Sequence, residues 1–230
     1  MKCMGLIGGM SWESTAVYYS QINQQVRARL GGLHSGRILM ESLDFASIVA
    51  LQTAGRWDEA AKILGASAVH LARGGADCVL ICTNTMHIVS EDVRAMSPAP
   101  LIDIIDVTGA ALMRAGMKRP LLLATRYSME HGFYHDRMMA LHGIEPIVPD
   151  KAGRDVMHRI IFDELCCGLI SETSRAEVID IIAQGIDDGA DSVILGCTEI
   201  CMLIGQSHSP LPLFDSTALH VAAAVDFALN

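Results

Sequence analysis

Two short polar clusters, each directly after an apolar run, hold the residues of this chain best suited to acid–base chemistry. Residues 75–85 read GADCVLICTNT, and residues 189–199 read GADSVILGCTE. At the constant offset that aligns these segments, Thr83 matches Cys197. A hydroxyl and a thiol therefore stand at equivalent positions of an internal repeat. Such a repeat predicts two similar half-molecules, with Thr83 and Cys197 opposed.

A second pair of segments supports the repeat. The motif Pro-Leu-x-Asp occurs at 100–103 and again at 212–215, at an offset shorter by two residues. We expect the two aspartates, Asp103 and Asp215, to anchor loops or the neighbouring His220 rather than to transfer protons.

Cys197 has two interpretations at this point, a buried core side chain or a catalytic thiol. A lone cysteine in a strand is usually a small core hydrophobe. Here the following residues are polar, which favours a position where the chain leaves the core. A thiol near helix N-termini and hydroxyls can shift toward thiolate from a free pKa of about 8.5. Cys82 lies one residue out of this register, so its side chain should point to the other face of its strand and pack in the core.

Composition narrows the class of protein. The net charge is −9 and the basic residues are scattered, which argues against a nucleic-acid partner. Seven cysteines without a CxxC pair indicate a reducing compartment, no disulfide framework and no zinc or other metal site. The apolar runs are far shorter than the ~18 residues that span a bilayer. The sequence thus predicts a cytoplasmic protein without a membrane partner.

The elements that must position the two clusters alternate between strands and helices. We expect strands at 4–7, 37–42, 78–82, 101–105, 121–124, 145–148, 193–195 and 212–214. We expect helices from Ser11 or Ser14 to Gly31, and at 57–73, 129–142, 154–166, 174–188 and 219–229. This order predicts an α/β fold with a parallel, doubly wound sheet in each half. Ligands bind beyond the carboxyl ends of such strands, where both clusters lie.

Three motifs in combination resemble the aspartate/glutamate racemase family, which racemises amino acids without a cofactor. They are GLIGGMSWEST at 5–15, CTNTMH at 82–87 and GCTEI at 196–200, and the resemblance covers essentially the whole chain. It implies two pseudo-symmetric three-layer α/β/α domains with mostly parallel sheets, an interdomain active-site cleft, and a homodimer. We assign residues 1–101 with 216–230 to the first domain and residues 102–215 to the second.

The resemblance also implies a reaction. Family members place one cysteine on each face of the substrate Cα, but the first of these positions is Thr83 here. The expected activity is that of an isomerase acting on L-aspartate or L-glutamate, with no cofactor and no metal. Cys197 would remove the Cα proton, and Thr83, or a water it holds, would reprotonate the opposite face. The only partners expected are the small-molecule amino acid and a second copy of the chain.

Family position also suggests the substrate-binding residues. They are Met10, Gln52, Asn84, Thr85, Thr125 and Thr198, with Glu199 and His87 holding the site. The family's basic residue for an acidic side chain is missing, since residues 162–165 read FDEL, and Arg126 is the substitute. This gap leaves two alternatives open. One is a broad-specificity racemase that accepts a neutral amino acid such as homoserine, and the other is an amino-acid-binding protein whose catalysis has degraded.

Overall fold

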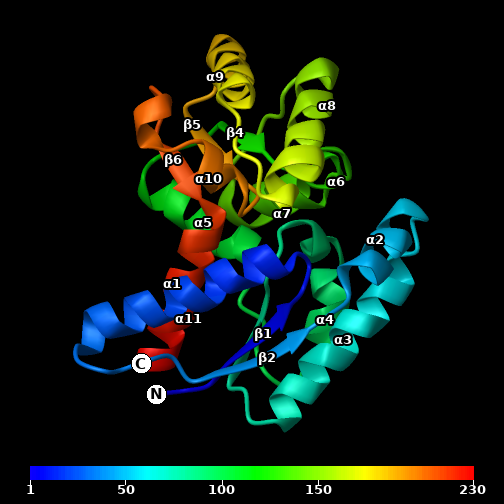
Figure 1. Cartoon of the computed structure of the whole chain (residues 1–230), viewed down its shortest axis with the longest axis vertical. Helices are drawn as coiled ribbons and strands as arrows, with labels where there is room; N and C mark the ends of the chain where they lie inside the picture. Colours follow the sequence, from blue (N-terminus) through cyan, green and yellow to red (C-terminus); the bar gives the residue numbers. More distant parts are fainter. The chain divides into compact units, whose positions relative to one another are not determined.

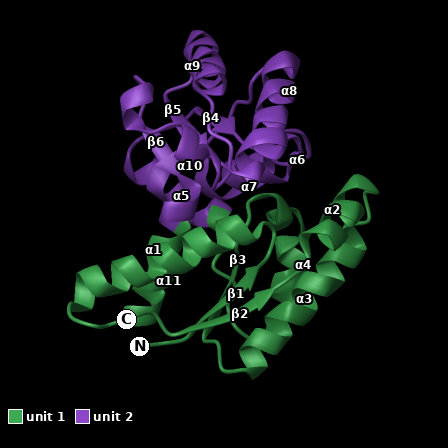
Figure 2. Ribbon diagram, in the orientation of Figure 1, with its two compact units in different colours: residues 1–104, 220–230 green, residues 105–219 purple.

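The computed structural model describes residues 1–230, and it divides into two compact units. Unit 1 contains Met1–Ile104 and His220–Asn230, and unit 2 contains Ile105–Leu219 (Figure 2). The chain therefore leaves unit 1 once and returns to it for its last helix. The sequence-based domain boundaries, after residues 101 and 215, stay a prediction about which segments fold together.

The sheet of unit 1 is parallel, with the strand order β2-β1-β3. Its strands are β1 (Met4–Gly8), β2 (Ile38–Ser42) and β3 (Cys78–Ile81). Every residue of β1 and β3 is buried, as parallel strands covered on both faces must be. One parallel bridge, from Val79 to Leu101, extends the sheet beyond β3.

Helices cover both faces of this sheet (Figure 1). The helices are α1 (Trp12–Leu30), α2 (Phe45–Thr53), α3 (Trp57–Arg73), α4 (Ser90–Met96) and α11 (Ser216–Leu229). One apolar cluster joins α1 and α11 to one face, and it includes Tyr18, Ile22 and Val225. A second cluster joins α2, α3 and α4 to the other face, and it includes Ile48, Leu64 and Val93. Unit 1 therefore has the predicted three layers.

Local sequence explains why α1 forms where it does. Ser11 is its N-cap, and the Ser11 hydroxyl accepts a hydrogen bond from the Ser14 backbone N–H at 3.2 Å. Tyr18, Ile22 and Val26 recur every four residues, and all three are fully buried. The helix ends before a glycine, as predicted, because Gly31 adopts a positive φ of 75°.

Unit 2 repeats the same sheet. Its strands are β4 (Pro120–Leu123), β5 (Ser192–Leu195) and β6 (Leu213–Asp215), all parallel in the order β4-β5-β6. Val193 pairs with Leu213 as Val79 pairs with Leu101 in unit 1. The backbone N–H of each valine donates to a proline carbonyl at 2.9 Å, Pro212 or Pro100. The repeat in the sequence is therefore a repeat of strand pairing.

Most of the remaining helices belong to unit 2, and one of them begins at the boundary. They are α5 (Ile104–Arg114), α6 (Arg126–Glu130), α7 (Phe133–His142), α8 (Lys151–Arg159), α9 (Glu172–Asp187) and α10 (Ile200–Leu203). A five-residue π-helix, η2 (Ile160–Glu164), and a 3-10 turn, η3 (Leu165–Cys167), follow α8.

Two predicted helices differ from the structure. The single helix expected at 129–142 is two helices, because Gly132 adopts a left-handed φ of 76° between α6 and α7. The helix expected at 154–166 begins earlier, at Lys151, since the Asp150 carboxylate caps it by accepting from the Gly153 N–H at 2.7 Å. It then changes to a π-helix after Arg159.

Two predicted strands shrink to single bridges. The strand expected at 101–105 is limited to Leu101, because Ile104 already begins α5. The strand expected at 145–148 is limited to Ile147, which bridges Leu121. Both segments lie at the edge of a sheet and pair with only one strand.

Candidate functional site

Thr83 stands just beyond the carboxyl end of β3. The chain bends there and enters a 3-10 helix, η1 (Thr85–Val89). The residues at 78–82 and at 84–87 are all buried, and Thr83 between them is half-buried. Thr83 is thus the one residue of this strand end that solvent can reach.

Cys82, directly before Thr83, points into the core. It is fully buried in the apolar cluster that also contains Cys78, Leu80 and Tyr18. Burial raises the pKa of the Cys82 thiol. The prediction that Cys82 packs in the core is confirmed.

The other predicted site residues of unit 1 belong to the segment that follows Thr83 or are linked to it through Met86. Met10, Gln52, Asn84 and Thr85 are all buried, although three of the four are polar. The Gln52 amide of α2 donates to the Met86 sulfur of η1 at 3.1 Å. Met10, in the loop after β1, shares an apolar cluster with Met86. We refer to Met10, Gln52 and residues 83–85 as the Thr83 cluster.

Cys197 occupies the equivalent position in unit 2, just beyond β5. Residues 192–196 and 198–200 are buried, and Cys197 is half-buried. Its sulfur donates a hydrogen bond to Oε2 of Glu199 at 2.9 Å. Glu199 is 4% exposed, so this carboxylate meets the thiol away from bulk water. We refer to Cys166 and residues 197–199 as the Cys197 cluster.

The resting state of Cys197 is a thiol. Burial raises its pKa well above the ordinary range, and the negative charge of Glu199 raises it further. The expectation that nearby helix ends would shift Cys197 toward thiolate is therefore wrong. The sequence did not reveal that the strongest neighbour of the sulfur is an anion, two residues along the chain.

The turn around Cys197 is tied to the start of α11. The Thr198 hydroxyl lies 3.2 Å from the hydroxyl of Thr217, and both residues are buried. The Ser216 hydroxyl donates to the Leu195 carbonyl at 2.8 Å. These hydrogen bonds fix the position of the turn that carries Thr198. Thr217, which holds the Thr198 side chain, was not identified from the sequence.

Thr125 and Arg126 follow β4 at the same edge of the sheet. The Thr125 hydroxyl accepts from the Ser128 N–H at 3.4 Å and caps α6. The Arg126 guanidinium donates to Asp155 of α8 at 2.9 Å, and Lys151 donates to the same carboxylate at 2.8 Å. The charge of Arg126 is therefore compensated within the protein. Binding an acidic substrate through Arg126, which stays a prediction, requires it to exchange Asp155 for the ligand.

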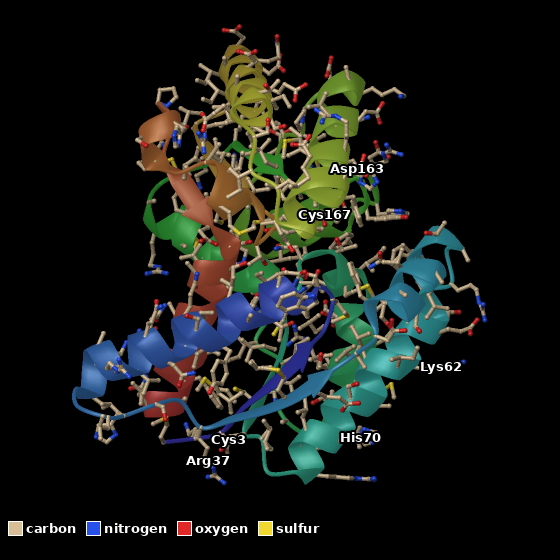
Figure 3. All side chains as sticks on the ribbon, viewed as in Figure 1. Cys3, Arg37, Lys62, His70, Asp163 and Cys167 are labelled. Atoms are coloured by element: carbon tan, nitrogen blue, oxygen red, sulfur yellow. The ribbon has the colours of Figure 1, made fainter.

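Cys166 is a second neighbour of the site that the sequence motifs did not identify. Its sulfur lies 3.9 Å from Oε1 of Glu199, so one carboxylate meets two thiols. Its neighbour Cys167 is exposed, and Figure 3 labels Cys167 with Asp163 on the segment after α8. No signal in the sequence distinguishes the two adjacent cysteines, because the π-helix before them sets which one turns inward.

Two further cysteines lie at the opposite ends of the unit 1 strands. Cys3 precedes β1, near Arg37 in Figure 3, and Cys78 begins β3. Both are buried, and burial raises the pKa of Cys78 to about 12 and that of Cys3 in the same direction. This burial makes both of them packing residues of unit 1.

Thr83 and Cys197 belong to different units, so their predicted opposition across one cleft stays a prediction. None of the helices combines the length and the apolar character that crossing a membrane demands. The chain also has no group of three or more His, Cys, Asp or Glu side chains placed to hold a metal ion.

Comparison with protein families gives one match that spans nearly the whole chain. The model of the Asp/Glu/hydantoin racemase family matches residues 7–224. Among characterised relatives, the chain is 22% identical over 168 residues to the broad specificity amino-acid racemase RacX of Bacillus subtilis (strain 168). That alignment covers 70% of this chain and 69% of the relative.

Solved structures give the same result at higher identity. A candidate Asp/Glu racemase from Yersinia pestis is 47% identical, with a TM-score of 0.94 over 100% of both chains. An aspartate racemase homologue from Pyrococcus horikoshii OT3 is 29% identical, with a TM-score of 0.88 over 100% of both chains. The two-domain racemase fold expected from the sequence is therefore confirmed.

Proposed function

Because this chain belongs to the Asp/Glu/hydantoin racemase family, we propose that it racemises L-aspartate or L-glutamate without a cofactor. Cys197 takes the proton from Cα of the L-enantiomer. Thr83, or a water that it holds, supplies a proton to the opposite face. The substrate-binding residues are those predicted from the sequence: Met10, Gln52, Asn84, Thr85, Thr125, Arg126, Thr198 and Glu199.

The observation that carries this proposal is the shared environment of Thr83 and Cys197. Each follows the same strand of a repeated sheet, and each is the half-buried residue in an otherwise buried run. A reaction on a small molecule needs accessible groups in a site that otherwise excludes water. Two such groups at equivalent positions suit a reaction that removes a proton from one face and adds one to the other.

Glu199 gives Cys197 a route to its basic form. The Sγ proton passes along the 2.9 Å hydrogen bond to Oε2, which leaves a thiolate and a neutral carboxyl group. The net charge of the pair stays −1 during this transfer, so no additional charge is buried. The thiolate then takes the Cα proton, and its electron pair passes into the substrate as a carbanion stabilised by the site.

The two faces differ in chemical strength. A hydroxyl is a far weaker base than a thiolate. Removal of the Cα proton from a D-substrate, which falls to Thr83, is therefore slow. The L- and D-enantiomers have equal free energy, so kcat/KM must be the same in both directions. A preference for L-substrates therefore shows in kcat and KM separately, not in their ratio.

A second candidate function is a broad-specificity racemase that accepts neutral amino acids such as homoserine. It is favoured by the pairing of Arg126 with Asp155, which leaves that cation compensated. Arg159 likewise has its charge compensated, because it is ion-paired with Glu164 of the acidic run at 163–164. This basic residue is therefore also paired within unit 2. An amino-acid-binding protein with degraded catalysis is the remaining alternative, and it predicts no turnover.

Proton NMR in D2O tests the proposal. We expect the wild type to remove the Cα proton signal of L-aspartate or L-glutamate, with slower appearance of the D-enantiomer. Cys197→Ala should abolish both changes, whereas Cys167→Ala, an exposed thiol outside the cluster, should retain them. Exchange that persists in Cys197→Ala refutes the assigned base. No exchange with either amino acid, but exchange with homoserine, selects the second candidate.

A further inference from the structure

The imidazole of His87 is held between two backbone groups of unit 1. Its Nδ1 lies 2.8 Å from the Thr83 carbonyl oxygen, which can only accept a hydrogen bond. Its Nε2 lies 3.2 Å from the Ile104 backbone nitrogen, which can only donate. The proton is therefore on Nδ1 and the lone pair on Nε2. This bonding fixes one neutral tautomer, and His87 is 2% exposed.

His220 is hydrogen-bonded to the same segment of chain, residues 102–104, but as a donor. Its Nε2 lies 2.7 Å from the Ile102 carbonyl and donates to it, and its Nδ1 accepts from the Tyr18 hydroxyl at 2.9 Å. Burial lowers the pKa of His220 to about 3. The two rings lie edge to face, with centroids 5.9 Å apart. Two neutral histidines thus bind Ile102 and Ile104, just where the chain leaves unit 1.

We propose that His87 is a positioning residue that orients Thr83 for proton transfer on its face of the substrate. The proposal rests on the proposed function, in which Thr83 or its water supplies that proton. His87 does not touch substrate in this mechanism. It holds the Thr83 carbonyl, and with it the peptide plane between Thr83 and Asn84.

The Thr83 side chain makes this constraint effective. Threonine has one rotatable bond between backbone and hydroxyl, and its branched Cβ restricts that bond, so the backbone largely decides where Oγ1 lies. Proton transfer requires Oγ1, or a water on it, within hydrogen-bond reach of Cα. A displacement of about 1 Å can cost on the order of 10²-fold in rate. Cys197, in unit 2, has its own support from Glu199 and does not depend on this bond.

Two substitutions separate the two hydrogen bonds of the ring. The Asn amide nitrogen in His87→Asn lies near the place of Nδ1 and retains a donor for the Thr83 carbonyl. The Gln amide oxygen in His87→Gln lies near the place of Nε2 and retains an acceptor for Ile104. Tyr18→Phe is the matched control, because the buried hydrogen bond that it removes is to the neighbouring His220, while both partners of the His87 ring are kept.

The readout is the ratio of two rates measured on L-substrate in D2O. Exchange of the Cα proton with retention of the L-form uses Cys197 alone, whereas formation of the D-form also needs Thr83. We expect His87→Gln to raise the ratio of exchange to racemisation about tenfold. His87→Asn should keep the wild-type ratio, and Tyr18→Phe should lower Tm without changing the ratio. Equal losses of both rates in His87→Gln, or the same ratio change in Tyr18→Phe, would overturn the proposal.

A second measurement is independent of turnover. The 15N chemical shifts of the His87 ring in the wild type should show a protonated Nδ1 and an unprotonated Nε2. The opposite tautomer, or a doubly protonated ring at neutral pH, overturns the positioning role even if racemisation occurs. If the expected tautomer is found but no amino acid is turned over, the proposed function fails while the hydrogen-bond arrangement stands.

Discussion

The Thr83 cluster and the Cys197 cluster are built on the same strand arrangement but are supported in different ways. In the Cys197 cluster the reactive side chain itself is hydrogen-bonded, by the Glu199 carboxylate at 2.9 Å. In the Thr83 cluster the backbone carbonyl of the reactive residue is held, by His87 at 2.8 Å. In the proposed mechanism Glu199 accepts a proton, whereas His87 only maintains a position.

The repeat shows that unit 1 lacks more than a thiol. At the offset that matches Thr83 to Cys197, Thr85 matches Glu199. The Thr83 cluster therefore lacks the carboxylate as well as the sulfur, so it has neither the stronger base nor its proton acceptor. The comparison teaches that the acid–base chemistry available at each strand end depends on two residues, the one at the strand end and the one two positions later.

The largest effect should come from removing the thiol. We expect Cys197→Ala to reduce kcat with L-substrate by about 10³-fold, because acid–base groups of this kind contribute 10²–10⁴-fold. Thr83→Ala should cost only about tenfold, because water can replace a hydroxyl as a proton donor. Steady-state kinetics by circular dichroism measures both. Equal losses in the two variants would remove the asymmetry between the clusters.

The carboxylate should give the next largest effect. Glu199→Gln removes the proton acceptor, so kcat at neutral pH should fall by about 10²-fold. The same change removes the charge of Glu199, which together with burial raises the pKa of Cys197, so the thiol ionises at lower pH than in the wild type. The deficit should therefore shrink as pH rises, which a pH profile of kcat measures. A loss that is uniform across pH would indicate that Glu199 only shapes the site.

Adding a thiol to unit 1 should have a moderate effect. We expect Thr83→Cys to raise kcat/KM with D-substrate about tenfold, and with L-substrate by the same factor, since the equilibrium constant is fixed. The gain is limited because Thr85, unlike Glu199, cannot accept the new thiol's proton. Thr83→Ser, which keeps the hydroxyl, is the matched control and should change little. No gain in Thr83→Cys would show that position 83 does not face the substrate Cα.

The last expected effect is on stability rather than on activity, and it concerns unit 1 in acid. His220 has a pKa lowered to about 3, so it stays neutral in the folded protein while the unfolded chain takes up a proton below about pH 6.5. The free energy of unfolding should thus fall between pH 6.5 and 3, by at most about 1.4 kcal/mol per pH unit from this group. Urea unfolding across that range measures the slope. In His220→Gln, whose amide can still donate to the Ile102 carbonyl, the slope should be smaller, and an unchanged slope would assign it to other groups.

Much of the fold was predictable because its signals are local. Four-residue spacing identified Tyr18, Ile22 and Val26 as the buried face of α1, and flanking glycines marked where helices end. Strand alternation turned Cys82 into the core and left Thr83 in register with Cys197. Those properties depend on the period of the backbone, which neighbouring residues already specify. Gly132 shows the limit, because a glycine inside a helical pattern does not reveal whether it will adopt a left-handed conformation.

The sequence by itself determined the repeated strands, the family and the identity of the two strand-end residues. Tertiary structure decided the partners of the site residues: Glu199 at the Cys197 sulfur, Cys166 at Glu199, Asp155 at Arg126, and Ile104 at His87. The physical reason is that hydrogen bonds and pKa shifts depend on distances of a few ångströms and on burial. Except for the Cys197–Glu199 pair, the partners in each contact are between 17 and 33 residues apart along the chain, so only the folded chain brings them together.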